Sequence, residues 1–410
     1  MSKIAHPDRR LAPRPLPAHL ASAMLLWLSS RAALPILKHV SLPRSNPGEQ
    51  LHALAEEIDA RGYDSVAEAL DNEILDRAGA YLAGLEAYRR HPIRRPDGAL
   101  PVLWRDGSTR LLDYGPESTG PVVLIVPSLI NRYYILDLVP ERSFVRHLVG
   151  QGLRPVVVDW GEPGGDEHDF DLTDYVVGRL EAAFDAAIRI AGAPIGVIGY
   201  CMGGLLALAL ALRRQSELAC LALLATPWDF HADRAAQARR IAQAARALLL
   251  ACDAQRGVPV DIIQSLFLIL DPFSAQRKFT RFAALDPKSD GARRFVALED
   301  WLNDGVPLAL GVARECANSW YGENEPALGH WRIDAQRVDP KLLRRPALVV
   351  VPSEDRIVPP SSAEPLTAEL GSATALRPPL GHVGMMSAAR APKMLWTPIV
   401  DWLRTQLGNQ

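Results

Sequence analysis

The chain contains little cysteine, with four residues among 410: Cys201, Cys220, Cys252 and Cys316. None of them forms a C-x-x-C pair, and the ten histidines are scattered, so the spacing of a zinc site is missing. A disulfide framework is typical of much smaller secreted domains. This composition predicts a reducing, cytoplasmic compartment and neither a metal nor another cofactor.

An excess of charge of one sign is also lacking, because 45 Lys and Arg stand against 47 Asp and Glu, for a net charge of -2. No long basic run is present, so nothing indicates a nucleic-acid partner. Hydrophobic residues make up 48% of the chain, which allows a large core.

Long hydrophobic runs are scarce as well. Near the N-terminus the apolar run 21–28 follows Arg9, Arg10 and Arg14 and loosely resembles the core of a signal peptide. The run ends at Ser29-Ser30-Arg31 and is too short to span a bilayer. We therefore predict no transmembrane span, but a surface helix whose apolar face touches a hydrophobic phase.

What is present is a change of pattern along the chain. Residues 1–95 have helical spacing and no strong strand signal, and two short runs around Asp106-Gly107 predict a hairpin over 102–112. Strands and helices then alternate, which predicts a mostly parallel sheet covered by helices on both faces. The expected strands are 122–126, 155–159, 195–198, 218–224, 348–351 and 373–377, and the expected helices are 143–150, 171–191 and 396–407.

A helix-rich segment with Trp228, Trp301, Trp320 and Trp331 interrupts this alternation between the fourth and fifth strands. An insertion at this point is the usual place for a cap over an α/β-hydrolase site. The fold class predicted is thus α/β, an α/β-hydrolase fold with an inserted helical cap and a helical N-terminal region. The predicted parts are 1–95 (helical N-terminal region), 96–226 (first part of the core), 227–339 (cap) and 340–410 (second part of the core).

The stretch GYCMGG, residues 199–204, has the layout of a nucleophile elbow. A short apolar run precedes it and a long one follows, as in the strand, turn and helix that normally present serine in G-x-S-x-G. Here Cys201 stands at the serine position. The flanking glycines allow close packing, and the positive end of the helix dipole favours a thiolate. We predict Cys201 as the nucleophile.

Two backbone N–H groups are expected to form an oxyanion hole. The N–H of Met202, the residue after the nucleophile, is the standard first donor. The second donor should come from the loop that follows the strand 122–126, where Ile130 is preferred and Leu129 is the next candidate.

An acid and a histidine should follow the nucleophile in chain order. Asp355 follows the strand 348–351 and His382 follows the strand 373–377, so His382 is the predicted base and Asp355 its orienting partner. Asp159, at the end of another strand, is the reserve acid. Each residue alone has an ordinary structural explanation, but the three positions together satisfy the order of a triad.

Sulfur at the elbow favours acyl transfer from thioesters. A thiolate attacks a thioester readily, and the acyl-cysteine that forms is itself a thioester, so the exchange is close to isoenergetic and the acyl group stays activated. Serine would lose that activation by forming an ester.

Several motifs, in order along the chain, resemble polyhydroxyalkanoate synthases. The matching stretches are 127–138, 141–146, 158–161, the G-x-C-x-G-G box at 199–204, 226–230, 354–360 and 381–384. The resemblance implies Cys201 as the acyl-carrying nucleophile, His382 as base and Asp355 as its partner. It further implies (R)-3-hydroxyacyl-coenzyme A as substrate and an insoluble polyester as product. The partners implied are the polyester granule surface and a homodimer or an accessory synthase subunit.

Two features depart from the family. Arg356 follows the acid where the family usually has histidine, and the N-terminal region is intermediate in length between the synthase subclasses. Two other functions therefore remain open. One is a thioesterase or esterase on the same fold, acting on acyl-coenzyme A or 3-hydroxyalkanoate oligomers. The other is a non-catalytic granule-associated protein.

Overall fold

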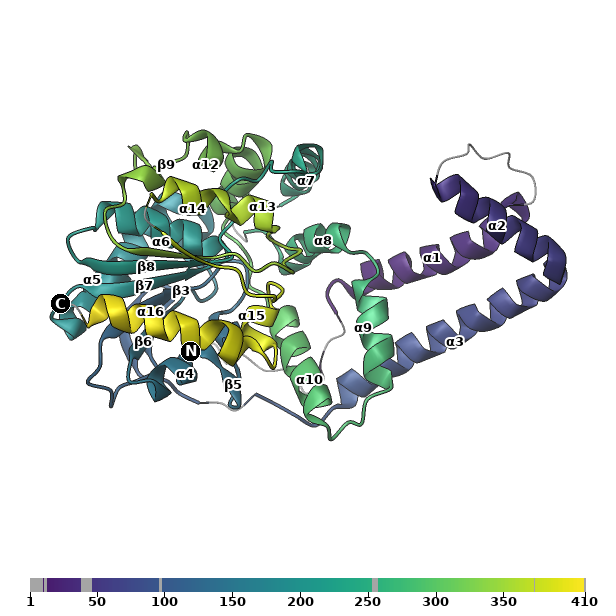
Figure 1. Ribbon diagram of the computed structural model, residues 1–410, viewed down its shortest axis with the longest axis horizontal. Helices are drawn as coiled ribbons and strands as arrows, with labels where there is room; N and C mark the ends of the chain where they lie inside the picture. Colours follow the sequence, from purple (N-terminus) through teal and green to yellow (C-terminus); the bar gives the residue numbers. More distant parts are fainter. Residues whose placement is uncertain are drawn as a thin grey trace. The chain divides into compact units, whose positions relative to one another are not determined.

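The computed structural model describes residues 10, 13–37, 46–95, 98–252, 257–371 and 373–408 (Figure 1). Arg9 of the predicted basic segment lies outside them. The chain forms two compact units, one of residues 1–93 and 267–303 and one of residues 94–266 and 304–410. These limits differ from the predicted parts, because 267–303, expected in the cap, packs with the N-terminal helices.

The larger unit is built on an eight-stranded sheet with the strand order β1-β2-β6-β3-β7-β8-β11-β12. The antiparallel strands β1 and β2 stand at one edge, and the strands that follow them in the sheet, β6, β3, β7, β8, β11 and β12, run parallel to one another. The mostly parallel α/β sheet predicted from the sequence is thus confirmed. The strands of this sheet are β1 (Val102–Asp106), β2 (Thr109–Asp113), β3 (Val122–Val126), β6 (Arg154–Asp159), β7 (Ile195–Tyr200), β8 (Leu218–Leu224), β11 (Ala347–Val350) and β12 (Thr374–Leu376).

Short elements complete this unit. Two small ribbons pair β4 (Asp137–Val139) with β5 (Arg142–Ser143) and β9 (Arg332–Ile333) with β10 (Gln336–Arg337). The α-helices are α4 (Phe144–Gly150), α5 (Glu181–Ala191), α6 (Met202–Arg213), α7 (Ala235–Leu249), α11 (Leu310–Glu315), α12 (Glu325–Leu328), α13 (Pro360–Ala363), α14 (Pro365–Glu369), α15 (Gly384–Ser387) and α16 (Thr397–Leu407). The other helical turns are η1 (Tyr133–Leu136), η2 (Gly165–Asp169), η3 (Asp174–Leu180), η5 (Cys316–Gly322), η6 (Pro340–Leu342) and η7 (Pro392–Trp396).

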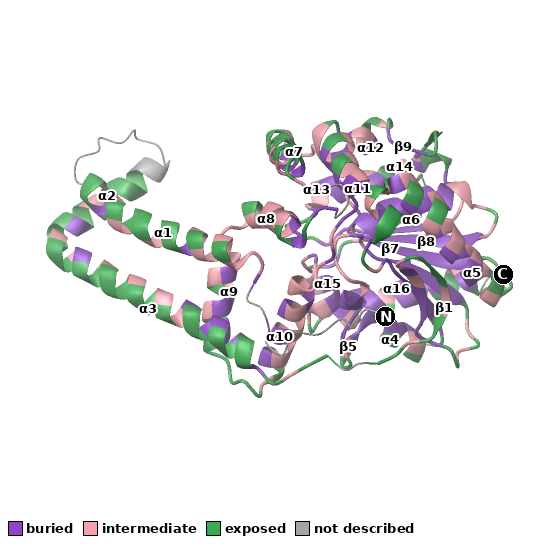
Figure 2. Cartoon of the chain, turned by 180° about the vertical axis from the view of Figure 1, so that it is seen from behind, coloured by how far each residue is buried: buried purple, intermediate pink, exposed green. Residues whose placement is uncertain are grey.

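Helices cover both faces of the sheet. Gly196 on β7 faces Leu403 and Leu407 of α16, whereas Gly199 faces Ala207 of α6. Residues at even and odd positions of a strand point to opposite faces, so α16 and α6 lie on opposite sides of β7. Figure 2 shows the strands between them as buried.

Continuous apolar runs account for the centre of the sheet. All five residues of β3, VVLIV, are buried, as expected of a strand that is covered on both faces. Helix α6 is also apolar all round, and every residue from Met202 to Leu212 is buried. The core therefore surrounds the strand and helix that flank Cys201.

The smaller unit contains only helices in its described part: α1 (Leu16–Leu37), α2 (Asn46–Arg61), α3 (Tyr63–Arg90), α9 (Ser274–Ala283) and α10 (Asp290–Asn303). Helix α8 (Val260–Leu270) contains the point in the sequence where the larger unit ends and the smaller unit resumes, between residues 266 and 267. The core of the smaller unit gathers Tyr81, Tyr88 and Phe279, and the rings of Tyr88 and Phe279 meet edge-on at 5.6 Å. Glycine at position 84 lets α3 approach the backbone of Phe279.

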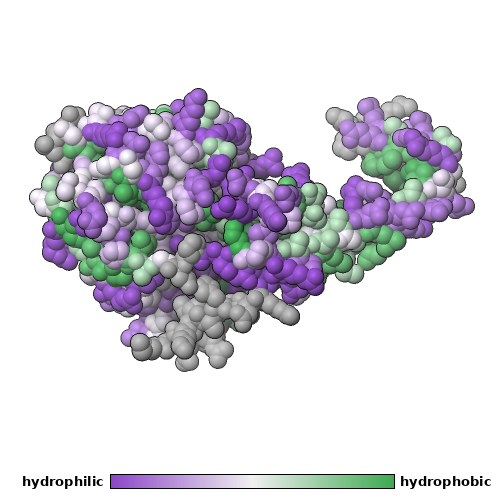
Figure 3. Space-filling model, turned by 90° about the horizontal axis from the view of Figure 1, so that it is seen from below, coloured by the Kyte–Doolittle hydropathy of each residue, from purple (hydrophilic) through white to green (hydrophobic). Residues whose placement is uncertain are grey.

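Helix α1 is longer than the apolar run that predicted it. It spans 22 residues, and its most apolar window has a mean hydropathy of 1.5 and is 11% buried. By length and composition it is the one helix among the described residues that could cross a membrane, because the helix is longer than the apolar run 21–28. Signal sequences and the core helices of soluble proteins pass the same test. Met24, Leu25, Leu28 and Ile36 are exposed on it, and apolar side chains reach the surface of this unit in Figure 3.

Candidate active site

Cys201 stands at a sharp turn between β7 and α6. Its φ is 57° and its ψ is -127°, a combination that a residue with a side chain rarely adopts, so the turn stores strain. Its N–H donates to the carbonyl of Leu224 at 2.9 Å, which ties the turn to the neighbouring strand β8. Cys201 is partly exposed while Tyr200 and Met202 beside it are buried. The geometry is that of a nucleophile elbow.

The glycines of the GYCMGG box are required by space. A Cβ on Gly199 would collide with Gly204, and a Cβ on Gly203 would collide with the carbonyl oxygens of Val126 and Pro127. A Cβ on Gly204 would strike the side chain of Thr226. The backbones of β7 and α6 therefore pack directly against each other next to the thiol of Cys201.

His382 and Asp355 lie together at the same edge of the sheet. Nδ1 of His382 lies 2.7 Å from Oδ2 of Asp355, whose side chain is fully buried. The other oxygen of Asp355 accepts the N–H groups of Ile357 and Val358 at 2.8 and 2.9 Å. Both carboxylate oxygens are thus engaged, and the carboxylate orients the imidazole.

The imidazole of His382 also hydrogen-bonds Cys201. Burial by itself lowers the pKa of His382, but the negative charge of Cys201 and the hydrogen bonds to Asp355 and Cys201 outweigh it and raise this pKa to about 10. The imidazolium form of His382 is therefore stable at this site. The structure brings the three predicted residues into one chain of contacts.

The predicted oxyanion donors differ in their surroundings. Met202 opens α6, where the first N–H groups of a helix have no partner inside the helix. The N–H of Ile130, however, donates to the hydroxyl of Ser128 in its own loop at 3.1 Å. This bond engages the preferred second donor, which leaves the next candidate, Leu129, a residue that is 3% exposed.

Two other aspartates, Asp159 and Asp304, have partners outside the triad. Asp159, the reserve acid, pairs with Arg110 and accepts the N–H of Gly161 at 3.1 Å. Asp304, in the segment predicted to be the cap, accepts hydrogen bonds from the hydroxyl of Tyr134 at 2.8 Å and from the guanidinium of Arg132 at 3.2 Å. Neither replaces Asp355 at the imidazole.

The surroundings of the other cysteines and of the tryptophans indicate packing and not catalysis. Burial on β8 raises the pKa of Cys220 to about 12, whereas Cys252 and Cys316 are only partly buried. The rings of Trp320 and Trp331 meet edge-on at 5.6 Å, as in ordinary packing. Among the residues that the structure describes, no group of three or more His, Cys, Asp and Glu side chains is placed to hold a metal ion.

Sequence reasoning missed two tyrosines near the thiol. Tyr200 donates its hydroxyl to the carbonyl of His382 at 3.2 Å. Tyr321 lies on the π-helical turn η5, and burial together with the charges of Cys201 and Cys316 raises the pKa of its phenol. No spacing in the sequence connects position 321 with position 201. The signal for Tyr200 was its place inside the elbow.

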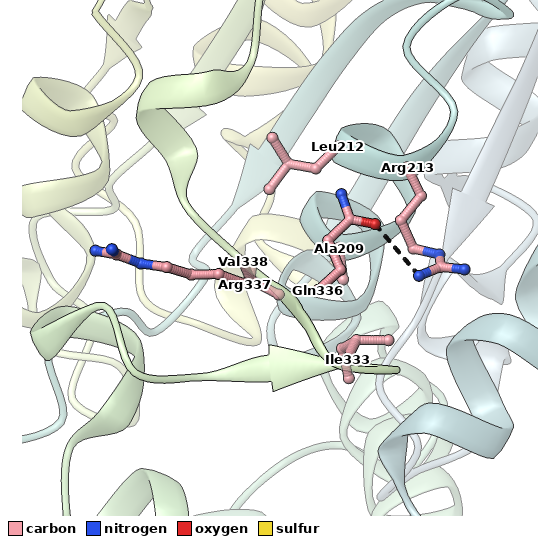
Figure 4. Close-up of a pocket in the computed structure, with 7 residues that line it drawn as sticks. All are labelled: Ala209, Leu212, Arg213, Ile333, Gln336, Arg337 and Val338. Carbon is pink, nitrogen blue, oxygen red and sulfur yellow. Dashed lines mark hydrogen bonds between the residues drawn. The ribbon is translucent and has the colours of Figure 1, made fainter.

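A shallow depression of about 150 Å³ lies between α6 and the β9–β10 ribbon (Figure 4). Arg213 at its rim donates to Gln336 at 3.3 Å. Its residues on α6, which are Ala209, Leu212 and Arg213, lie toward the end of the helix opposite to Cys201. It is therefore separate from the triad.

Comparison with known proteins places these features in a family. A family model described as the alpha/beta hydrolase fold matches residues 121–389. A poly(3-hydroxyalkanoate) polymerase subunit PhaC from Haloferax mediterranei is 28% identical over 317 residues, which cover 75% of this chain and 64% of that protein. The chain thus spans just under two thirds of that relative. The protein of the same name from Allochromatium vinosum is 26% identical over 341 residues, or 82% of this chain and 90% of that protein.

Solved structures resemble the chain more distantly. A thermophilic esterase from Thermogutta terrifontis is 18% identical, covers 73% of this chain and 94% of its own, and has a TM-score of 0.45. The resemblance to polyhydroxyalkanoate synthases predicted from the motifs is confirmed by the sequence relatives, and the chain belongs to the α/β-hydrolase fold family.

Proposed function

We propose that the chain is an acyltransferase that polymerises (R)-3-hydroxyacyl groups from coenzyme A thioesters, with Cys201 as the acyl carrier. The observation that carries the proposal is the thiol of Cys201 at a strained elbow, in contact with an imidazole that Asp355 orients. The PhaC relatives support the substrate class.

The first half-reaction loads the enzyme. The thiolate of Cys201 attacks the thioester carbonyl, and the bond to the coenzyme A sulfur breaks. His382, as imidazolium, gives its proton to that leaving sulfur. The N–H groups of Met202 and Leu129 are the proposed donors to the oxyanion.

The second half-reaction transfers the acyl group to an alcohol. The 3-hydroxyl of another hydroxyacyl unit gives its proton to the now neutral His382 and attacks the acyl-cysteine carbonyl. An ester forms, and the thiolate of Cys201 leaves. Because both oxygens of Asp355 are already engaged, its role in this scheme is to orient His382 and stabilise the imidazolium.

We further propose that α1 binds the growing polyester surface. Met24, Leu25, Leu28 and Ile36 recur at helical spacing and are 55%, 68%, 63% and 58% exposed. An apolar stripe of this kind favours contact with a hydrophobic phase. The homodimer or accessory subunit implied by the resemblance stays a prediction.

The test is a product assay of purified protein with (R)-3-hydroxybutyryl-coenzyme A. We expect release of coenzyme A together with polyester, and loss of both in Cys201→Ala. Free 3-hydroxybutyrate in step with coenzyme A, without polymer, would instead identify a thioesterase. Absence of coenzyme A release from the wild-type protein as well, with α1-dependent binding to polyester, would identify a non-catalytic granule protein.

A further inference from the structure

Tyr200 occupies the variable position between the first glycine and the nucleophile of the elbow. It is the last residue of β7 and is 4% exposed. A large aromatic side chain placed there must lie beneath or beside the nucleophile. Its contacts determine whether it only fills space.

Both parts of the Tyr200 side chain contact His382. The hydroxyl donates to the backbone carbonyl of His382 at 3.2 Å. The phenol ring stacks on the imidazole, with 5.3 Å between the ring centroids and 27° between the planes. A tyrosine that only fills a core needs a hydrogen-bond partner for its buried hydroxyl, but that partner need not be the histidine carbonyl. Its ring also need not stack on an imidazole.

The hydroxyl remains a donor over the working range of pH. Burial raises the pKa of Tyr200 well above its ordinary value, and the negative charges of Cys201 and Asp355 act in the same direction. The bond to the His382 carbonyl is therefore made by a neutral phenol throughout.

His382 needs such support because it stands in a loop. It lies between β12 and α15, outside any regular element, and its imidazole would otherwise be oriented only by its side-chain contacts with Asp355 and Cys201. Tyr200 instead belongs to the strand that carries the thiol. A bond from this strand to the His382 backbone fixes the distance between base and nucleophile.

We propose that Tyr200 is a positioning residue for acyl transfer, which holds the His382 loop through its hydroxyl and stabilises the imidazolium through its ring. The negative face of an aromatic ring attracts a cation that lies over it. The imidazolium forms when Cys201 loses its proton, so the ring favours the thiolate–imidazolium pair. This inference rests on the proposed thiol chemistry, but not on whether the acyl group ends in polymer or in free acid.

Two variants separate the two contacts. Tyr200→Phe keeps the ring and removes the hydroxyl, whereas Tyr200→Leu removes both. Tyr81→Phe is the matched control, because it removes the hydroxyl of a tyrosine that is 1% exposed in the other unit. For each protein we would measure kcat and KM for coenzyme A release, the rate of Cys201 alkylation by iodoacetamide from pH 5 to 10, and the melting temperature.

We expect Tyr200→Phe to lower kcat about 3- to 10-fold with KM unchanged, the range that one hydrogen bond supplies. In Tyr200→Leu we expect alkylation at pH 6 to slow a further 3- to 30-fold, roughly the range of a cation–π contact. This slowing should become smaller toward pH 10, because His382, with a pKa of about 10, loses its own positive charge there. In Tyr81→Phe, kcat, KM and the rate of Cys201 alkylation should be the same as in the wild type.

Wild-type kcat in Tyr200→Phe together with a wild-type alkylation profile in Tyr200→Leu would overturn the proposal. So would losses of rate that follow the melting temperature without a change in the pH profile, because they would indicate packing alone. If the wild-type protein makes free acid, the polymerase proposal fails, yet the alkylation profiles still decide the role of Tyr200.

Discussion

Nδ1 of His382 lies 2.7 Å from Oδ2 of Asp355, and the hydrogen bond between them joins two residues 27 positions apart in the chain at the carboxyl edge of the sheet. The parallel strands β11 and β12 are direct neighbours, so the loops that follow them leave the sheet side by side. The acid and the base are brought together by this pairing of strands.

Asp355→Asn should lower kcat for coenzyme A release by about 10²- to 10⁴-fold, because an amide no longer fixes the imidazole tautomer or stabilises the imidazolium. Asp159→Asn is the matched control, a buried aspartate at another strand end that pairs with Arg110. Its kcat should stay within a few-fold of the wild type. Equal losses in both variants would assign the effect of Asp355 to folding.

Gly203→Ala should destabilise the elbow, because the added methyl group meets the carbonyl oxygens of Val126 and Pro127, which cannot rotate away. We expect a loss of about 2 kcal/mol or more in the free energy of unfolding, measured by urea titration. In Gly178→Ala the added Cβ meets nothing within 4 Å, so its stability should be unchanged or slightly higher. A Gly203→Ala protein as stable as Gly178→Ala would refute the close packing.

The stability of the larger unit should depend on the protonation of Glu315. Burial raises the pKa of Glu315 to about 7, the hydrogen bond from the N–H of Leu172 opposes this shift, and the charges of Asp171 and Glu325 add to it. The folded protein thus holds a proton that the unfolded chain releases near pH 4.5. This contribution to stability is complete below pH 4.5 and disappears as the pH rises to 7.

Glu315→Gln removes that dependence. Relative to the wild type, we expect the variant to gain roughly 1–3 kcal/mol in unfolding free energy between pH 4.5 and pH 8, measured by urea titration. Glu117→Gln, at an exposed position, should show no such change with pH. Parallel curves for wild type and Glu315→Gln would show that the carboxyl is ionised throughout.

Leu25→Glu combined with Leu28→Glu should weaken the binding of the protein to polyester particles at least tenfold in a sedimentation assay, because two exposed leucines lose their apolar contact. Coenzyme A release from a soluble substrate should not change. Ser29→Glu with Ser30→Glu adds the same charge to exposed positions of the same helix and should bind as the wild type. Equal loss in both pairs would mean that charge, and not the apolar stripe, controls binding.

The strands at the centre of the sheet and the nucleophile elbow could be predicted from the residues alone. Unbroken apolar runs such as 122–126 can only be buried on both faces, and the elbow depends on residues that are neighbours in the chain. The three triad residues Cys201, Asp355 and His382 could also be predicted from their order in the sequence. They follow parallel strands, and the carboxyl ends of parallel strands meet at one edge of the sheet.

The contacts between groups across that edge depend on long-range packing and could not be predicted from the residues. Nothing in the chain near Tyr200 indicated that its hydroxyl reaches the carbonyl of His382, or that Ser128 engages the N–H of Ile130. The packing of 267–303 with the N-terminal helices was equally hidden. Apolar periodicity shows that one face of a helix is buried. It does not show which distant segment of the chain packs on that face, because this depends on the fit between the two surfaces.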